Sequence, residues 1–363
     1  MIKSKKLISF LKKNDISFFC GVPDSILKSF SLEIQNEKNH FITSNEGTAI
    51  SFGAGYHLAT KKLPCIFMQN SGLGNSINPL TSLNHKNVYS LPCLLLIGWR
   101  GAPNLKDEPQ HKVKGSITTN LLKLMGIKYY VLKKNDNFRN LKSLISFGKL
   151  NNLPVACLIK DGILEKNTRK KNFIKNRVGI NRREFIFNLL KKIKKKTYVI
   201  STTGYTSREH FEIAEKIKNR HVKNFYMVGA MGHTNSLSLG FSLNTKKDVI
   251  CIDGDGSFLM HMGSMLLTSL NKKKNFKYIL LNNDIHESVG SQKTNVSKIN
   301  FKYFFKSMGI NEYLQISKKA DLSKINDVFK KKKSFFVEVK TLENKINILK
   351  RPQNLLKIKK KFY

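Results

Sequence analysis

Short apolar runs that alternate with helical patterns limit most strongly how this chain can fold. Each run is rich in Val, Ile, Leu and Phe and has the length of a strand, which favours strands buried on both faces. Such strands occur in parallel sheets covered by helices, so the sequence predicts an α/β fold. The predicted strands span residues 17–20, 64–68, 91–97, 155–159, 198–201, 249–252, 278–281 and 335–339.

The series of strands and helices occurs twice, which predicts two domains. A length of 363 residues allows roughly two domains of ordinary size, each with its own core. Between the halves, residues 165–183 (EKNTRKKNFIKNRVGINRR) are polar, basic and weakly periodic, as in an interdomain linker. We therefore predict domains at residues 1–165 and 179–363, joined by a linker at residues 166–178.

The net charge of +41 raises nucleic acid as a possible partner. The lysines are scattered, however, and the short basic runs fall at expected helix ends, connections and the C-terminal tail. The sequence contains no zinc-knuckle, RNP-type or helix-turn-helix signature. A solvated surface that reflects biased amino-acid usage explains the lysines better than a dedicated face, so we expect no specific nucleic-acid partner.

Neither a membrane span nor a disulfide framework is expected. No apolar run approaches the ~20 residues that a spanning helix needs. Lys12 and Lys13 interrupt the first apolar stretch, which predicts an amphipathic helix rather than a signal peptide. The five cysteines are odd in number, widely spaced and without a CxxC motif. We expect reduced, buried thiols and a cytoplasmic protein.

The sharpest chemical motif is GDG at residues 254–256, followed after 25 residues by NN at 282–283. Each follows a predicted strand, so both emerge at the carboxyl edge of a parallel sheet, where open α/β sheets bind ligands. Glycines let the backbone approach a diphosphate, and the next helix N-terminus favours its charge. The side-chain oxygens of Asp255 and Asn283 suit Mg²⁺, and the backbone carbonyl of Ile285 is a third candidate ligand.

A GDG tripeptide alone often does no more than close a turn. Its combination with NN and two preceding strands resembles the cofactor motif of thiamine-diphosphate-dependent enzymes. The resemblance implies thiamine diphosphate and Mg²⁺ as cofactors. It also implies a pyrimidine-binding-type domain before the linker, a diphosphate- and Mg²⁺-binding-type domain after it, and no middle domain.

The family also has a catalytic glutamate in its first domain, and SNEGTA at residues 44–49 is similar to the segment that carries it. The resemblance implies that Glu46 hydrogen-bonds N1′ of the aminopyrimidine and so promotes removal of the proton from thiazolium C2. Taken alone, Glu46 is better explained as a charge that is favourable at a helix N-terminus. Together with the downstream motif, it is the predicted catalytic carboxylate.

Two glycine loops extend the resemblance. GAMGH at residues 229–233 is similar to a loop whose backbone carbonyl, here that of Gly229, accepts from the cofactor's amino group, while Met231 supports the bent cofactor. Without the family match, Met231 indicates only core packing. QNSGLGN at residues 69–75 is similar to the pyrimidine-side loop, and by itself indicates a tight turn. The predicted cofactor-binding residues are Gly72, Gly74, Gly204, Gly229, Met231, Gly232, His233, Gly254, Asp255, Gly256, Ser257 and Asn283.

Four segments narrow the resemblance to phosphonopyruvate decarboxylases and the related sulfopyruvate decarboxylases. They are GVPDS at 21–25, IGWRG through KDEPQH at 97–111, TTGYTSRE at 202–209 and HESVG at 286–290. The resemblance implies decarboxylation of 3-phosphonopyruvate to phosphonoacetaldehyde and CO₂, in biosynthesis of phosphonates such as 2-aminoethylphosphonate. Sulfopyruvate or another small 2-oxo acid is the alternative substrate, because Ser291 and Lys293 stand where Gly and Pro are expected.

An anionic 2-oxo acid requires cations and hydrogen-bond donors near the thiazolium. Arg100, Lys106 and Lys293 are candidates, but single charges of this kind are more often solvated. We therefore predict His111 and His286, which lie inside matched motifs, as catalytic residues in addition to Glu46 and Asp24.

Asp24, in GVPDS, has two interpretations that the sequence leaves open. It can act as a proton relay for the reaction. It can equally serve as the N-cap of the helix expected to begin near Ser25.

The resemblance also implies a homodimer or higher homo-oligomer, because different subunits hold the two ends of the cofactor in this family. Glu46 of one chain then faces Asp255 of its neighbour. A rival from another class is a non-catalytic, basic nucleic-acid-binding protein on the same scaffold. It predicts strongly salt-dependent binding to generic DNA or RNA and no loss of function on Glu46→Gln.

Overall fold

The computed structural model describes residues 1–165, 178–330, 333–343 and 349–362. The chain forms two compact units, one of Met1–Lys171 with Ser288–Gln292 and the other of Asn172–Glu287 with Lys293–Tyr363. The predicted linker at residues 166–178 lies outside the described residues, apart from Val178. The domain boundaries therefore stay a prediction.

The first unit contains a six-stranded parallel sheet in the order β2-β1-β3-β4-β6-β5. The predicted strands at residues 17–20, 64–68 and 91–97 overlap three of its four internal strands, and the one at 155–159 coincides with the fourth. The strands are β1 (Phe19–Gly21), β2 (His40–Ile42), β3 (Cys65–Gln69), β4 (Leu94–Gly98), β5 (Lys128–Val131) and β6 (Val155–Ile159).

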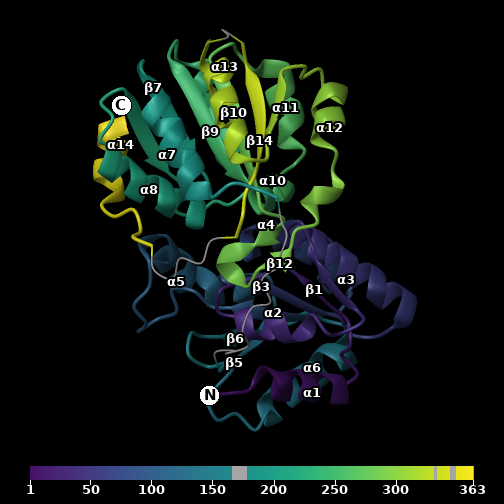
Figure 1. The fold of residues 1–363 in the computed structure, drawn as a ribbon. Helices are drawn as coiled ribbons and strands as arrows, with labels where there is room; N and C mark the ends of the chain where they lie inside the picture. The colour runs from purple at the N-terminus through teal and green to yellow at the C-terminus, as the bar shows by residue number, and fades with distance from the viewer. Residues whose placement is uncertain (166–177, 331–332, 344–348, 363) are drawn as a thin grey trace. The chain divides into compact units, whose positions relative to one another are not determined.

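The second unit repeats this topology (Figure 1). Its six-stranded parallel sheet has the order β13-β14-β10-β9-β7-β8, so its strands, taken in chain order, occupy the same places as β1 to β6. The strands are β7 (Thr197–Ser201), β8 (Val222–Tyr226), β9 (Asp248–Gly254), β10 (Phe276–Asn282), β13 (Tyr313–Ile316) and β14 (Phe335–Lys340). The two predicted parallel α/β sheets are confirmed.

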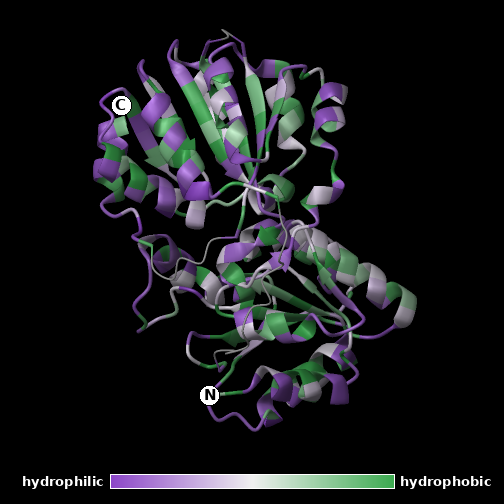
Figure 2. Ribbon diagram, viewed as in Figure 1, coloured by the Kyte–Doolittle hydropathy of each residue, from purple (hydrophilic) through white to green (hydrophobic). Residues whose placement is uncertain are grey.

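Helices cover both faces of the first sheet, because alternate strand residues point to opposite sides. In β4, Leu94 and Leu96 pack into one core, whereas Leu95 and Ile97 pack into the other. The first core holds α1 (Ser4–Lys13), α2 (Lys28–Ile34) and α6 (Arg139–Asn151); the second holds α3 (Glu46–Thr60), α4 (Leu73–Pro79) and α5 (Pro109–Leu124). The strands at the centre of the sheets are therefore mostly green, the colour of hydrophobic residues, in Figure 2.

The second sheet is covered in the same way. One core holds α7 (Arg182–Lys192), α8 (Tyr205–Ile217) and α13 (Ile325–Lys330). The other holds α9 (Thr234–Leu243), α10 (Asp255–Met260), α11 (Ser264–Asn271), α12 (Phe301–Ser307) and α14 (Leu355–Phe362). The segment that follows the GDG motif thus forms two helices, α10 and α11, rather than one. Two short strands, β11 (Ile285–His286) and β12 (Gln292–Lys293), follow β10.

The C-terminal tail, whose order the sequence left open, forms α14. Phe362 is buried against the rings of Tyr198, Phe225 and Phe241. The basic residues Lys359, Lys360 and Lys361 lie in the last turn of this helix, where positive charge is favourable.

All five cysteines are free and buried, as predicted. Burial raises the pKa of the Cys20 thiol to about 12, so this thiol is protonated near neutral pH. Within the described residues, no helix is both long and apolar enough to span a membrane.

Candidate active site

The GDG and NN motifs lie side by side at the carboxyl edge of the second sheet. β9 and β10 pair in parallel with Gly254 opposite Leu281, so the residues that follow each strand emerge together. The Asp255 carboxylate accepts from the backbone N–H of Gly256 at 2.9 Å and from Thr294 Oγ1 at 2.9 Å. Burial raises the pKa of Asp255 to about 7, although these two hydrogen bonds oppose the rise. A cation beside this carboxylate would offset the cost of burying its charge.

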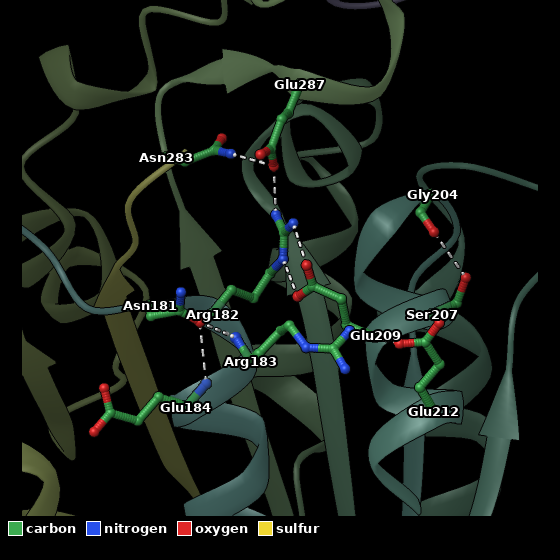
Figure 3. A network of polar contacts seen from close by, with 10 residues as sticks. All are labelled: Asn181, Arg182, Arg183, Glu184, Gly204, Ser207, Glu209, Glu212, Asn283 and Glu287. Carbon is green, nitrogen blue, oxygen red and sulfur yellow. Dashed lines mark hydrogen bonds and ion pairs between the residues drawn. The ribbon is translucent and has the colours of Figure 1, made fainter. Parts of the chain in front are cut away.

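Asn283 is held by contacts on both sides of its amide. Its Nδ2 donates to Glu287 Oε2 at 3.1 Å, and its Oδ1 accepts from the backbone N–H of Ile285 at 3.2 Å. Both Asn283 and Glu287 are buried. The amide is thereby oriented with its oxygen directed away from Glu287 (Figure 3).

Ser257 connects three predicted cofactor segments. Its Oγ accepts from the backbone N–H of Gly232 at 3.0 Å and from Thr202 Oγ1 at 3.1 Å. The loop at residues 229–233 and the turn before Gly204 are therefore fastened to the GDG segment. The left-handed backbone at Gly204 (φ +84°) and Gly232 (φ +89°) explains glycine at both positions.

Gly256 is required by close packing rather than by its backbone angle. A Cβ at this position would lie 2.9 Å from the His286 ring and 3.2 Å from Met231 Cε. Met231 and His286 therefore converge on the GDG segment. Burial lowers the pKa of His286 to about 4, so its imidazole is neutral near pH 7.

Glu46 begins α3 in the first unit, at the carboxyl edge of that sheet. Asn45 caps this helix, its Oδ1 accepting from the backbone N–H of Thr48 at 2.9 Å. The Glu46 carboxylate is buried and accepts from Asn75 Nδ2 at 2.8 Å. A Cβ at Gly72 would lie 2.4 Å from Glu46 Cγ, so the glycine loop provides the space that Glu46 occupies. The structure thus brings SNEGTA and QNSGLGN together.

Asp24 lies at the end of β1 and takes part in a turn before α2. Its Oδ2 accepts from the backbone N–H groups of Ile26 at 2.8 Å and Leu27 at 3.0 Å. Its Oδ1 is buried and accepts no hydrogen bond from the described residues. Burial raises the pKa of Asp24, against the effect of these N–H groups. One oxygen thus holds this turn, and the other is left for a second partner. The N-cap interpretation of Asp24 is wrong, because α2 begins at Lys28 with Leu27 as its N-cap and has no side-chain cap.

Arg100, at the end of β4, is tied to neighbouring loops. It pairs with both carboxylate oxygens of Asp107 and donates to Ser25 Oγ at 3.2 Å. Asn70 Nδ2 donates to the Arg100 carbonyl at 2.9 Å. A surface pocket of about 290 Å³ lies beside this pair, with Lys106 among its lining residues. Arg100 therefore holds the WRG…KDEPQH segment together, and its charge is already paired with that of Asp107.

His111 belongs to the same segment, in the first turn of α5. Its backbone carbonyl lies against Gly101, where a Cβ would come within 2.0 Å of it. The positive φ of +66° at Gly101 also favours glycine. Glycine at residue 101 therefore lets this turn approach the His111 backbone closely. The role of the His111 imidazole stays a prediction.

Comparison with known proteins finds two family models that match this chain. The family model "Thiamine pyrophosphate enzyme, N-terminal TPP binding domain" matches residues 3–121, and "Thiamine pyrophosphate enzyme, C-terminal TPP binding domain" matches residues 203–339. A phosphonopyruvate decarboxylase of Streptomyces viridochromogenes is 31% identical over 312 residues, covering 81% of this chain and 77% of its own. The chain belongs to the thiamine pyrophosphate enzyme family.

Sulfopyruvate decarboxylases are also similar to this member of the family. That of Methanosarcina acetivorans is 26% identical over 332 residues, covering 87% of this chain and 84% of its own. Subunits alpha and beta of the enzyme from Methanocaldococcus jannaschii match 43% and 35% of this chain, at 35% and 33% identity. These relationships make the protein a thiamine-diphosphate-dependent decarboxylase, a carboxy-lyase.

Its cofactors are thiamine diphosphate and the Mg²⁺ that accompanies the diphosphate. The residues present fit this pair. The carboxylate of Asp255, the amide oxygen of Asn283 and the Ile285 carbonyl are hard oxygen donors. In the described part of the chain, no group of three or more His, Cys, Asp and Glu side chains could hold a metal. A cation here would therefore draw further ligands from phosphate and water, as Mg²⁺ does.

Three residues of the second site were missed by the sequence interpretation. Arg182 was counted in the polar, basic stretch of residues 165–183, but it is buried and pairs with Glu209 and Glu287. Glu209 lies in the segment at residues 202–209 and Glu287 in the segment at 286–290. Their place in these two family-like segments was the only sequence signal for them. Nothing in the local sequence distinguishes Arg182 from the solvated basic residues around it.

Proposed function

We propose that this protein catalyses the non-oxidative decarboxylation of 3-phosphonopyruvate to phosphonoacetaldehyde and CO₂. Support comes from the similarity to a phosphonopyruvate decarboxylase over most of both chains. In this reaction the bond between the carboxylate and the ketone carbon breaks, CO₂ leaves, and a proton replaces it on that carbon. When bound, thiamine diphosphate supplies a thiazolium that accepts the electron pair released by the departing CO₂.

Glu46 is the proposed partner of the aminopyrimidine. The observation that carries this assignment is the buried position of its carboxylate against Gly72, with Asn75 donating to one oxygen at 2.8 Å. Asn75 fixes the side chain, so that the other oxygen can engage a ring nitrogen. A carboxylate held in this way can exchange a proton with that nitrogen without moving.

Asp255, Asn283 and the carbonyl of Ile285 are the proposed Mg²⁺ ligands. Gly254, Gly256 and Ser257 are the proposed diphosphate contacts, and a side chain at residue 256 would collide with His286 and Met231. Met231 extends toward the same segment and is the proposed apolar support of the cofactor. Gly204, Gly229, Gly232 and His233 complete the proposed cofactor contacts in this unit, with Gly72 and Gly74 in the other.

Asp24, His111 and His286 are the proposed proton-transfer and substrate-binding residues. The unpartnered Oδ1 and raised pKa of Asp24 support a role as a proton donor or relay. His286 is neutral near pH 7, so it would act by hydrogen bonding rather than by positive charge. The pairing of Arg100 with Asp107 leaves Lys106 as a better candidate than Arg100 for attracting an anion.

We further propose a homodimer or higher homo-oligomer in which Glu46 of one chain faces Asp255 of its neighbour. The relatives named as separate alpha and beta subunits support an assembly of more than one chain. A cytoplasmic location is proposed because five buried thiols suit a reducing compartment. A place in the biosynthesis of 2-aminoethylphosphonate-type compounds would follow from the product, an aldehyde that carries a phosphonate.

The deciding experiment compares phosphonopyruvate, sulfopyruvate and pyruvate as substrates of one purified sample. With thiamine diphosphate and Mg²⁺ present, we expect kcat/KM to be highest for phosphonopyruvate, measured as CO₂ released. Preference for sulfopyruvate would identify the alternative, which the similarity to sulfopyruvate decarboxylases supports. Turnover of none of the three would refute the proposed activity.

A further inference from the structure

A buried ionic network joins three distant segments of the second unit (Figure 3). Arg182 donates through Nε and Nη2 to the two oxygens of Glu209, at 2.7 and 3.0 Å. Its Nη1 donates to Glu287 Oε2 at 2.7 Å. The side chains of Arg182, Glu209 and Glu287 are 5%, 0% and 4% exposed. One guanidinium therefore serves two carboxylates, and the group carries one net negative charge away from water.

Local structure explains how these side chains meet. Asn181 caps α7, its Oδ1 accepting from the backbone N–H groups of Arg183 and Glu184, so Arg182 is held in the first turn. Glu209 lies on the buried side of α8, and Glu287 directly follows β11. The network thus links two helix starts to the segment that follows the NN motif.

Such a network is costly as a device for stability alone. Each buried charge loses several kcal/mol of hydration, and well-packed apolar residues often serve as well. Burial opposes the charge on Arg182, but the hydrogen bonds and charges of Glu209 and Glu287 raise its pKa above the ordinary value. The Arg182 guanidinium therefore stays charged. Glu287, the second carboxylate that it binds, is positioned for another contact.

That contact is with Asn283. Glu287 Oε2 accepts from both Arg182 Nη1 and Asn283 Nδ2, the latter at 3.1 Å. A carboxylate oxygen can only accept, so it selects the amide orientation that presents NH₂ to Glu287 and the oxygen to the opposite side. A rotated amide would place its oxygen against Glu287 and present NH₂ where a cation must bind.

We propose that Arg182, Glu209 and Glu287 are positioning residues that hold the Asn283 amide oxygen toward Mg²⁺. This inference rests on the proposed role of Asn283 as a metal ligand. Glu287 selects the orientation of the amide, and Arg182 and Glu209 hold Glu287. Residues that hydrogen-bond to metal ligands commonly raise metal affinity 10- to 100-fold. We expect an effect on the order of this size from the network.

The chain offers a matched control on the same two helices. Arg183, next to Arg182, pairs with Glu212 on α8 at 2.6 Å, and their side chains are 31% and 20% exposed. This pair has the same chemistry and joins the same helices, but among the described residues the hydrogen-bond partners of Glu212 are Arg183 and the backbone N–H of Lys350, not Asn283. Arg183→Met should therefore leave metal affinity within about twofold of wild type, because exposed pairs contribute little.

The test is a double-substitution cycle read by Mn²⁺ binding in the presence of thiamine diphosphate. Mn²⁺ accepts the same oxygen ligands as Mg²⁺, and electron paramagnetic resonance measures its free concentration without any turnover. Glu287→Leu should weaken Mn²⁺ binding roughly 10- to 100-fold. In an Asn283→Ala background, Glu287→Leu should have little further effect, because Glu287 acts through Asn283.

The outcomes separate this inference from the assignment on which it rests. If Asn283→Ala weakens Mn²⁺ binding but Glu287→Leu does not, the network has no positioning role and the metal ligand stands. If the two effects multiply, Glu287 acts independently of Asn283 and the inference fails. If Asn283→Ala leaves Mn²⁺ binding unchanged, Asn283 is not a ligand and both fail.

A second variant serves if Glu287→Leu does not fold. Glu287→Gln keeps the shape and an acceptor oxygen while it removes the charge, and it should weaken Mn²⁺ binding by a smaller factor in the same cycle. Activity at saturating Mg²⁺ provides a further reading. Restoration of kcat by excess metal supports positioning, whereas a kcat that stays low at every metal concentration contradicts it.

Discussion

Replacing Gly72 with alanine is expected to displace the Glu46 carboxylate while the fold survives. An added Cβ would lie 2.4 Å from Glu46 Cγ, 2.6 Å from Cδ and 2.5 Å from Oε1. The closest of these distances is about 1 Å shorter than the 3.4 Å at which ordinary contact begins. The side chain of Glu46 must therefore move by roughly that amount, and its hydrogen bond from Asn75 will be strained or lost.

The expected cost is kinetic rather than structural. A displacement of about 1 Å at a catalytic group can reduce turnover ~100-fold, which corresponds to about 2.7 kcal/mol in the barrier. Gly72 has φ −72° and ψ −14°, a right-handed conformation that alanine adopts without strain. The backbone change should therefore not unfold the protein, since it restricts mainly the unfolded chain.

The assay measures kcat for the 2-oxo acid that the wild type decarboxylates, alongside thermal unfolding of each variant. Gly55→Ala is the matched control, because a Cβ at this position in α3 meets nothing within 4 Å. It should keep wild-type activity and stabilise the protein by roughly 0.5–1 kcal/mol. A Gly72→Ala enzyme that retains more than half of the wild-type kcat would refute the packing argument.

Three further perturbations test other parts of the structure. Glu46→Gln should nearly abolish decarboxylation with an unchanged circular dichroism spectrum, and an active variant would remove Glu46 from the mechanism. Burial lowers the pKa of His210 to about 4 from 6.5, so the folded state binds this proton less readily than the unfolded state. The contribution of His210 to the free energy of unfolding is therefore fully present above pH 6.5. About 3 kcal/mol of stability is lost as the pH falls from 6.5 toward 4. Denaturant titrations of wild type and His210→Gln across that pH range measure this loss. Phe362→Ala should destabilise the second unit by about 3 kcal/mol, because this buried ring fastens α14 to β8 and its neighbours, and an unchanged Tm would contradict that packing.

The apolar runs in the sequence predicted the internal strands of each six-stranded sheet and missed the edge strands. In the two six-stranded sheets, all eight predicted strands are internal, and the four that were not predicted, β2, β5, β8 and β13, are the four edges. The short strands β11 and β12 were not predicted either. Internal strands are buried on both faces and give continuous apolar runs. Edge strands such as β5 (KYYV) are partly exposed, so their sequences mix polar and apolar residues and resemble connections.

The candidate sites divide along a similar line. Motifs that directly follow a strand, such as GDG after β9 and NN after β10, are placed by chain order because parallel strands end at one edge. The pairing of Glu46 with Gly72 and Asn75 joins separate segments, and no local pattern specifies it. It depends on how α3 and α4 pack beside β3.

The sequence by itself determined the α/β class, the repeated series of strands, and the motifs that are proposed to hold the cofactor, because hydrophobic period and glycine-rich turns are local properties. Only the tertiary structure decided which charges leave the solvent. Arg182 and Arg183 are adjacent in one basic segment, yet one is buried between two glutamates and the other lies at the surface. Burial of a charge depends on partners from distant segments, and those partners meet only when the sheet and its helices have packed.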